Sequence, residues 1–146
     1  MRWFDDIAIG DRASFGSREV VREEVIAFAE RYDPQPFHLD DAAAAQTHFG
    51  RIAASGWHSC AMTMAMHVEH MRDHPLAVVG GAGLDILRWV KPVYPGDVLR
   101  CESEVLDKRR DGDKPFGKVW QRTTVFNQYG EVVLTYVAII AISVRA

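Results

Sequence analysis

The sequence predicts an α+β fold in which a curved antiparallel sheet wraps around one long buried helix. From Gly56 to about His70, small and apolar side chains occupy positions on nearly every face of a helix, and a helix that is apolar all round is usually buried inside its protein. After His74-Pro75 the composition changes to runs rich in β-branched and aromatic residues, separated by turn residues. One buried helix followed by antiparallel strands with short turns indicates this architecture.

The elements before the long helix are short. Residues 11–21 predict a strand that leads into a helix over REEVIAFAERY, where apolar residues recur at helical spacing. An Asp-Pro break ends that helix, and the alanine-rich stretch that follows predicts a second, short helix capped by Asp40 or Asp41. After a loop, Ser55 is a suitable N-cap for the long helix.

The second half of the chain predicts four long strands joined by hairpins, which with the first strand make a sheet of about five. Tyr-Pro-Gly-Asp at 94–97, the charged stretch KRRDGDKPFG and the stretch NQYG are typical turn sequences. The four strands are expected at about 78–90, 97–107, 116–127 and 131–144.

Composition limits the class of protein. A chain of 146 residues with 48% hydrophobic and 25% charged residues predicts one domain, residues 1–146, with one core. A net charge of −3 does not suggest a nucleic-acid surface. No stretch reaches the roughly 20 apolar residues of a membrane span, and the acidic N-terminus is unlike a signal peptide. Two cysteines far apart fit a reducing, cytoplasmic setting.

The stretch YDPQPFHLDD raises the functional question. Its two prolines exclude helix on both sides of Gln35, so Asp33 and His38 are held five positions apart in a stiff loop. Such a loop can be a simple turn, because Asp before Pro is a common turn former. It can also direct a proton acceptor and a second polar group at one small molecule.

Four stretches of this chain form a recognisable set: D-P-Q-P-F-H at 33–38, A-S-G-W at 54–57, K-P-V-Y-P-G-D at 91–97 and N-Q-Y-G-E-V-V-L at 127–134. In this order they resemble the MaoC-like dehydratases, the family of the R-specific enoyl-CoA hydratases, which have the hotdog fold. The chain departs from the family pattern at Gln35, where the family has Asn, at Ser55, where it has His, and at Tyr32, where it commonly has Gly.

The resemblance implies a hydratase or dehydratase that adds or removes water across the 2,3 double bond of an acyl thioester. Asp33 and His38 would hold and activate the water. The backbone N–H of Gly56, at the positive end of the buried helix, would polarise the thioester carbonyl. The resemblance also implies a homodimer through the strand at about 78–90, a substrate carried on CoA or acyl carrier protein, and no metal or redox cofactor. Candidate substrate-binding residues are Gln35, Phe37, Ser55, Trp57 and His58.

Two other functions remain open. An acyl-CoA thioesterase would use an acid to activate water at the carbonyl carbon and would release free thiol. A non-catalytic acyl-thioester-binding subunit would bind ligand whether or not Asp33 and His38 were intact.

Other residues allow more than one interpretation. His67, His70 and His74 are spaced so that they could share one face of a helix, and three imidazoles on one face can bind zinc. A solvated helix end is the simpler interpretation. Arg88 and Lys91 either meet CoA phosphates or are solvated strand residues. The methionines of the long helix are expected in the core, where they could line an acyl pocket; they are Met62, Met64, Met66 and Met71.

Overall fold

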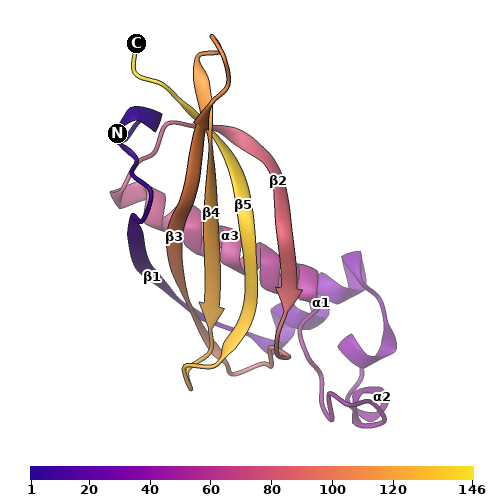
Figure 1. Cartoon of the computed structure of the whole chain (residues 1–146). Helices are drawn as coiled ribbons and strands as arrows, with labels where there is room; N and C mark the ends of the chain where they lie inside the picture. Colours follow the sequence, from indigo (N-terminus) through magenta and orange to yellow (C-terminus); the bar gives the residue numbers. More distant parts are fainter.

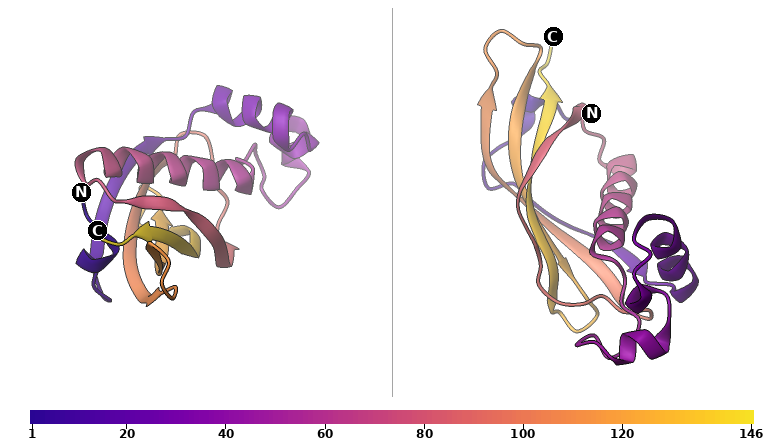
Figure 2. Two further views of the ribbon diagram at one scale, coloured as in Figure 1. Left: turned by 90° about the horizontal axis from the view of Figure 1, so that it is seen from above. Right: turned by 90° about the vertical axis from the view of Figure 1, so that its right-hand side faces the viewer.

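A five-stranded antiparallel sheet curves around helix α3, and the short helices between residues 22 and 45 gather at one end of the molecule (Figure 1, Figure 2). The computed structural model describes all 146 residues, and it confirms the predicted α+β hotdog fold. The elements are the 3-10 helix η1 (Phe4–Asp6), β1 (Arg12–Glu19), α1 (Arg22–Tyr32), the 3-10 helix η2 (Pro36–His38), α2 (Asp41–Ala45), α3 (Gly56–Asp73), β2 (Val78–Trp89), β3 (Val98–Arg110), β4 (Phe116–Phe126) and β5 (Val132–Ser143).

The strand order in the sheet is β1-β3-β4-β5-β2. Hairpins join β3 to β4 and β4 to β5, as predicted, and β1 pairs with the other side of β3. The prediction that hairpins join all four later strands is wrong for β2, which pairs with β5 at the far edge of the sheet. The turn at 94–97 therefore belongs to a crossover that runs from β2, at one edge of the sheet, to β3, next to the strand at the opposite edge. Turn residues mark where a strand ends, but they do not specify which strand becomes its neighbour.

Helix α3 packs one face against the concave side of the sheet (Figure 2). Met62 and Met66 are buried there, as predicted, among sheet residues such as Leu99 and Leu134. The expectation that the helix is buried on every face is wrong for the single chain. Met64 is 56% exposed, so this methionine is not in the core. Apolar composition shows which side chains favour burial, but only one face of the helix meets the sheet.

Strand β1 approaches α3 closely because Gly16 lacks a side chain. Its φ of +88° lies in the left-handed region, and a Cβ at this position would lie 2.7 Å from Met66 Sδ. The pairing of β1 with β3 shifts register between Phe15 and Arg18, on either side of this glycine. The irregularity bends β1 over the helix, as bulges commonly do.

Strand β2 is an edge strand, and no strand of the chain pairs with its outer side. Several large apolar residues on it are exposed, among them Leu84, Ile86 and Trp89. An exposed apolar edge is a surface that proteins usually cover or pair. None of the helices is both long enough and apolar enough to cross a membrane.

Candidate active site

The loop after α1 is held by its prolines as the sequence predicts. Asp33 caps the C-terminus of α1, where its backbone N–H donates to Ala29 O at 2.9 Å. Pro36 then opens η2, which ends at His38. Proline favours the first position of a helical turn because it has a fixed φ and needs no hydrogen-bond acceptor there. The loop thus turns back within a few residues, which brings the side chains of Asp33 and His38 together.

His38 is buried, with 5% of its surface exposed, and both ring nitrogens have a defined neighbour. Nδ1 lies 2.7 Å from Ala53 O. A carbonyl oxygen can only accept, so Nδ1 carries the hydrogen. Nε2 lies 3.3 Å from Asp33 Oδ2. In the neutral ring, Nε2 therefore presents its lone pair beside the carboxylate, and two acceptors converge on one point.

The carboxylate of Asp33 is anchored by two donors. Gln35 Nε2 donates to Oδ1 and Ser55 Oγ donates to Oδ2, each at 2.7 Å. Burial raises the pKa of this carboxyl. The hydrogen bonds from Gln35 and Ser55, together with the nearby His38, lower the pKa by more than burial raises it, so the pKa lies below its ordinary value. Asp33 is therefore ionised at neutral pH.

Ser55 joins this carboxylate to the start of α3. Its hydroxyl donates to Asp33 and accepts from Trp57 N–H at 3.3 Å, which confirms Ser55 as the N-cap. Gly56 is the first residue of the helix, and its N–H donates no hydrogen bond within the chain. Unpaired N–H groups and the helix dipole make this end positive. The structure therefore brings Asp33, His38 and the N-terminus of α3 into one cluster.

The sequence model of the family described as MaoC like domain matches residues 7–125. The chain belongs to the MaoC-like domain family. A MaoC-like dehydratase from Rhodospirillum rubrum has the same fold, with a TM-score of 0.89 and 36% identity over 100% of this chain and 99% of that chain.

Two curated hydratases are also similar to this MaoC-like chain. The (R)-specific enoyl-CoA hydratase of Aeromonas caviae is 32% identical over 136 residues, covering 92% of this chain and 94% of that protein. The mesaconyl-CoA hydratase of Cereibacter sphaeroides is 43% identical over 77 residues, which cover 51% of this chain and 22% of that protein.

The remaining candidate residues of the MaoC-like domain lie in different surroundings. The ring of Phe37 packs 4.5 Å from that of His38. Trp57 is exposed and meets the indole of Trp89 edge-on, with ring centroids 5.2 Å apart. His58 stacks on Phe28 of α1 at 4.7 Å, and its buried Nδ1 has no partner. Burial lowers the pKa of His58.

The three histidines further along α3 have separate neighbours. His67 Nε2 lies 3.1 Å from Thr123 Oγ1, and burial lowers the pKa of His67 to about 4. His70 stacks between Phe15, at 4.3 Å, and His74, at 4.4 Å. The three histidines thus make separate packing and hydrogen-bond contacts. No three His, Cys, Asp or Glu side chains of the chain form a group that could hold a metal ion.

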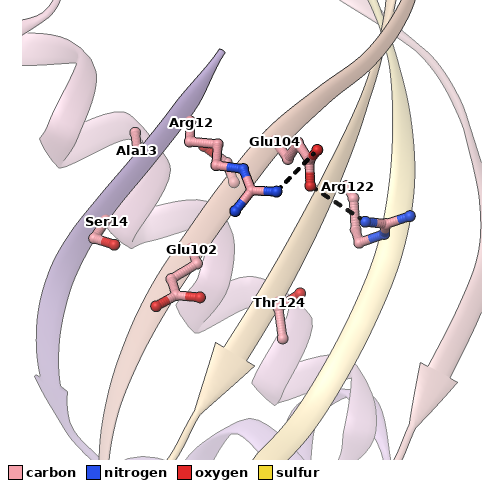
Figure 3. Close-up of a pocket in the computed structure, with 8 residues that line it drawn as sticks. Arg12, Ala13, Ser14, Glu102, Glu104, Arg122 and Thr124 are labelled. Atoms are coloured by element: carbon pink, nitrogen blue, oxygen red, sulfur yellow. Dashed lines mark hydrogen bonds and ion pairs between the residues drawn. The ribbon is translucent and has the colours of Figure 1, made fainter. Parts of the chain in front are cut away.

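Two polar hollows lie away from the cluster. One is on the outer face of the sheet, opposite α3, where Glu104 pairs with Arg12 and Arg122, each at 3.4 Å (Figure 3). The second lies at the crossover between β2 and β3, where Lys91 forms an ion pair with Glu131. In both hollows acidic partners offset the basic side chains, so neither is a simple anion site.

Three contacts of the cluster were not predicted from the sequence: the Ala53 carbonyl on His38, the bond between Ser55 and Asp33, and the hydrogen bond of 2.9 Å that the indole N–H of Trp89 donates to Gly56 O. A carbonyl carries no sequence signal. Ser55 was predicted as a cap and as a candidate substrate-binding residue, but not as a donor to Asp33, although a hydroxyl can donate and accept at once. The glycine at position 56 was itself a signal, because an absent side chain often marks close approach by another group.

Proposed function

We propose that this protein is an (R)-specific enoyl-CoA hydratase or related acyl-thioester dehydratase. Family membership and the two similar curated hydratases support a reaction of this class. The observation that carries the proposal is the distance of 3.3 Å between Asp33 Oδ2 and His38 Nε2. Two proton acceptors this close, beside a positive helix end, suit a reaction that deprotonates water and stabilises a developing oxyanion.

Asp33 and His38 would hold one water between them. The water donates one hydrogen to the Asp33 carboxylate and the other to His38 Nε2, which is free to accept because Nδ1 donates to Ala53. As the water oxygen bonds to the β-carbon, Nε2 takes its proton, and the ionised Asp33 stabilises the imidazolium. The imidazolium then returns this proton to the α-carbon, so the atoms of water add across the double bond. A positioned acid–base pair contributes about 10² to 10⁴ in rate.

Gly56 N–H would stabilise the thioester oxygen while the enolate forms. It is unpaired, it lies at the positive end of α3, and it directly follows Ser55, which contacts Asp33. One donor of this kind contributes about 10² to 10³ in rate. Ser55 and Gln35 would act on Asp33, by holding its carboxylate and keeping it ionised. Phe37, Trp57 and His58 remain candidates for binding the acyl thioester.

We also propose that the protein forms a homodimer through β2. This strand has an unpaired outer side and exposed apolar residues such as Leu84 and Ile86. A second copy could pair with it and extend the sheet, which would cover the exposed edge.

The test is a panel of trans-2-enoyl-CoA thioesters of varied chain length and branching. Loss of the enoyl absorbance and release of free thiol are followed in parallel, for the wild type and Asp33→Asn. We expect the wild type to consume enoyl groups without releasing thiol, and Asp33→Asn to lose about 10²-fold or more of that rate. Thiol release from saturated acyl-CoA would instead identify a thioesterase. Hydration that survives Asp33→Asn would refute the role of Asp33.

A further inference from the structure

Trp89, the last residue of β2, lies over the first residue of α3. Its indole Nε1–H donates to Gly56 O at 2.9 Å. The ring also meets Trp57 edge-on, with an interplanar angle of 81°. The edge strand of the sheet is thereby tied to the helix end that the candidate site uses.

The contact between Trp89 and Gly56 is as close as packing allows. A Cβ on Gly56 would lie 2.4 Å from Trp89 Cε2 and 2.7 Å from Nε1, distances that a real side chain does not tolerate. The indole therefore occupies the space that a side chain at position 56 would fill. The ring contacts the Cα of Gly56, while the indole N–H holds its carbonyl.

These two contacts constrain a residue that has little constraint of its own. Glycine has the greatest backbone freedom of any residue. The N–H of Gly56 also lies in the first turn of α3, where no helical hydrogen bond holds it. The direction of this N–H depends on the φ and ψ of Gly56 and its neighbours, and Trp89 restricts the residue from two sides.

We propose that Trp89 is a positioning residue that holds the backbone of Gly56, through its carbonyl and its Cα, so that the Gly56 N–H points at the substrate carbonyl. This inference rests on the proposed function, in which Gly56 N–H stabilises the thioester oxygen. Trp89 does not touch the reacting atoms and acts only through Gly56. The effect on rate follows from geometry, because a displacement of about 1 Å in a catalytic group can cost about 10²-fold.

The test combines a measurement on Gly56 itself with kinetics. Labelling with ¹⁵N-glycine gives signals from the 11 glycines, and the Gly56 signal is assigned by its loss in Gly56→Ala. The order parameter of the Gly56 amide is then compared in wild type, Trp89→Phe and Trp120→Phe. The matched control, Trp120, lies on β4, where its ring contacts Arg109. Benzothienylalanine at position 89 is the second variant, because it keeps the bicyclic shape and lacks only the N–H.

In Trp89→Phe we expect the order parameter of Gly56 to fall from about 0.85 to below about 0.6. We also expect kcat for hydration to fall about tenfold while KM changes less than about twofold. Benzothienylalanine should lower both the order parameter and kcat by less, and Trp120→Phe should change neither.

An unchanged order parameter at Gly56 would overturn the proposal, as would a fall shared by all the glycines or a fall that leaves kcat unaltered. If the wild type hydrates no enoyl thioester, the proposed function fails. The order parameter of the Gly56 amide then still decides whether Trp89 holds the backbone of this residue. The two failures are therefore distinguishable.

Discussion

Replacement of Ser55 by alanine tests how the candidate site is assembled. The hydroxyl is buried, donates to Asp33 Oδ2 at 2.7 Å and accepts from Trp57 N–H at 3.3 Å. Ser55→Ala removes both hydrogen bonds while it leaves the backbone and the prolines of the loop unchanged. It therefore separates the anchoring of Asp33 from the stiffness of the loop.

The expected loss of stability follows from these two bonds. Loss of a serine N-cap costs about 1 kcal/mol. A hydrogen bond to a charged group contributes about 1.5 to 3 kcal/mol, and the Asp33 side chain is only 16% exposed, so water replaces the lost donor poorly. We expect Ser55→Ala to lower the free energy of unfolding by about 2 to 4 kcal/mol at pH 7.

Part of this loss depends on pH. The bond from Ser55 helps to lower the pKa of Asp33 in the folded protein. A carboxyl whose folded pKa is lowered contributes stability above its unfolded pKa, here near 3.8, and that stability is lost as the pH falls through the folded pKa. The difference between Ser55→Ala and wild type should therefore be largest at neutral pH and smaller in acid, and it should approach the loss of the cap alone as the pH falls below the folded pKa of Asp33.

Urea unfolding of wild type, Ser55→Ala and Ser103→Ala at pH 7 and near pH 3 measures both effects. Ser103 is a buried serine of β3 whose hydroxyl makes no hydrogen bond within the chain, so it controls for loss of the hydroxyl alone. The reasoning would be refuted if Ser55→Ala lost no more stability than Ser103→Ala, or if its loss were equal at the two pH values.

Three further predictions concern Gly56, His67 and strand β2. Gly56→Ala should lower the urea midpoint by an amount equivalent to about 1 to 3 kcal/mol, because its Cβ would meet the Trp89 ring at 2.4 Å; an unchanged midpoint would show that the ring moves freely. Burial lowers the pKa of His67 from 6.5 to about 4. The folded protein should therefore lose about 3 kcal/mol of stability from this group as the pH falls from 6.5 to 4, and His67→Gln should remove that part of the pH dependence in urea titrations. Leu84→Lys on β2 should shift sedimentation from dimer to monomer with the circular dichroism unchanged, whereas Ile9→Lys, at another exposed apolar residue that lies outside β2, should not.

Much of the candidate site could be predicted because its shape is local. The prolines around Gln35 exclude helix through the fixed φ of the ring, and they stiffen the loop between Asp33 and His38 wherever the chain is placed. The caps at Asp40 and Ser55 were predictable for a similar reason, since a short polar side chain reaches only the next few N–H groups.

Contacts between distant segments could not be predicted in this way. The bond from Ser55 to Asp33 joins residues 22 positions apart, and that from Trp89 to Gly56 joins residues 33 apart. Local patterns do not encode such distances. The same limit explains two errors. The position of β2 depends on which strand it pairs with, and the burial of Met64 depends on which face of α3 meets the sheet.

The amino-acid sequence alone determined the stiff acid–imidazole loop, the capped helix behind it and the strands, because backbone sterics, capping and hydrophobic periodicity act within a few residues. Only the tertiary structure decided which strand lies at the edge of the sheet, which face of α3 is buried, and which groups hold Asp33 and Gly56 in place. Those outcomes depend on how the sheet closes over the helix, and this packing brings together side chains whose positions in the chain do not reveal that they meet.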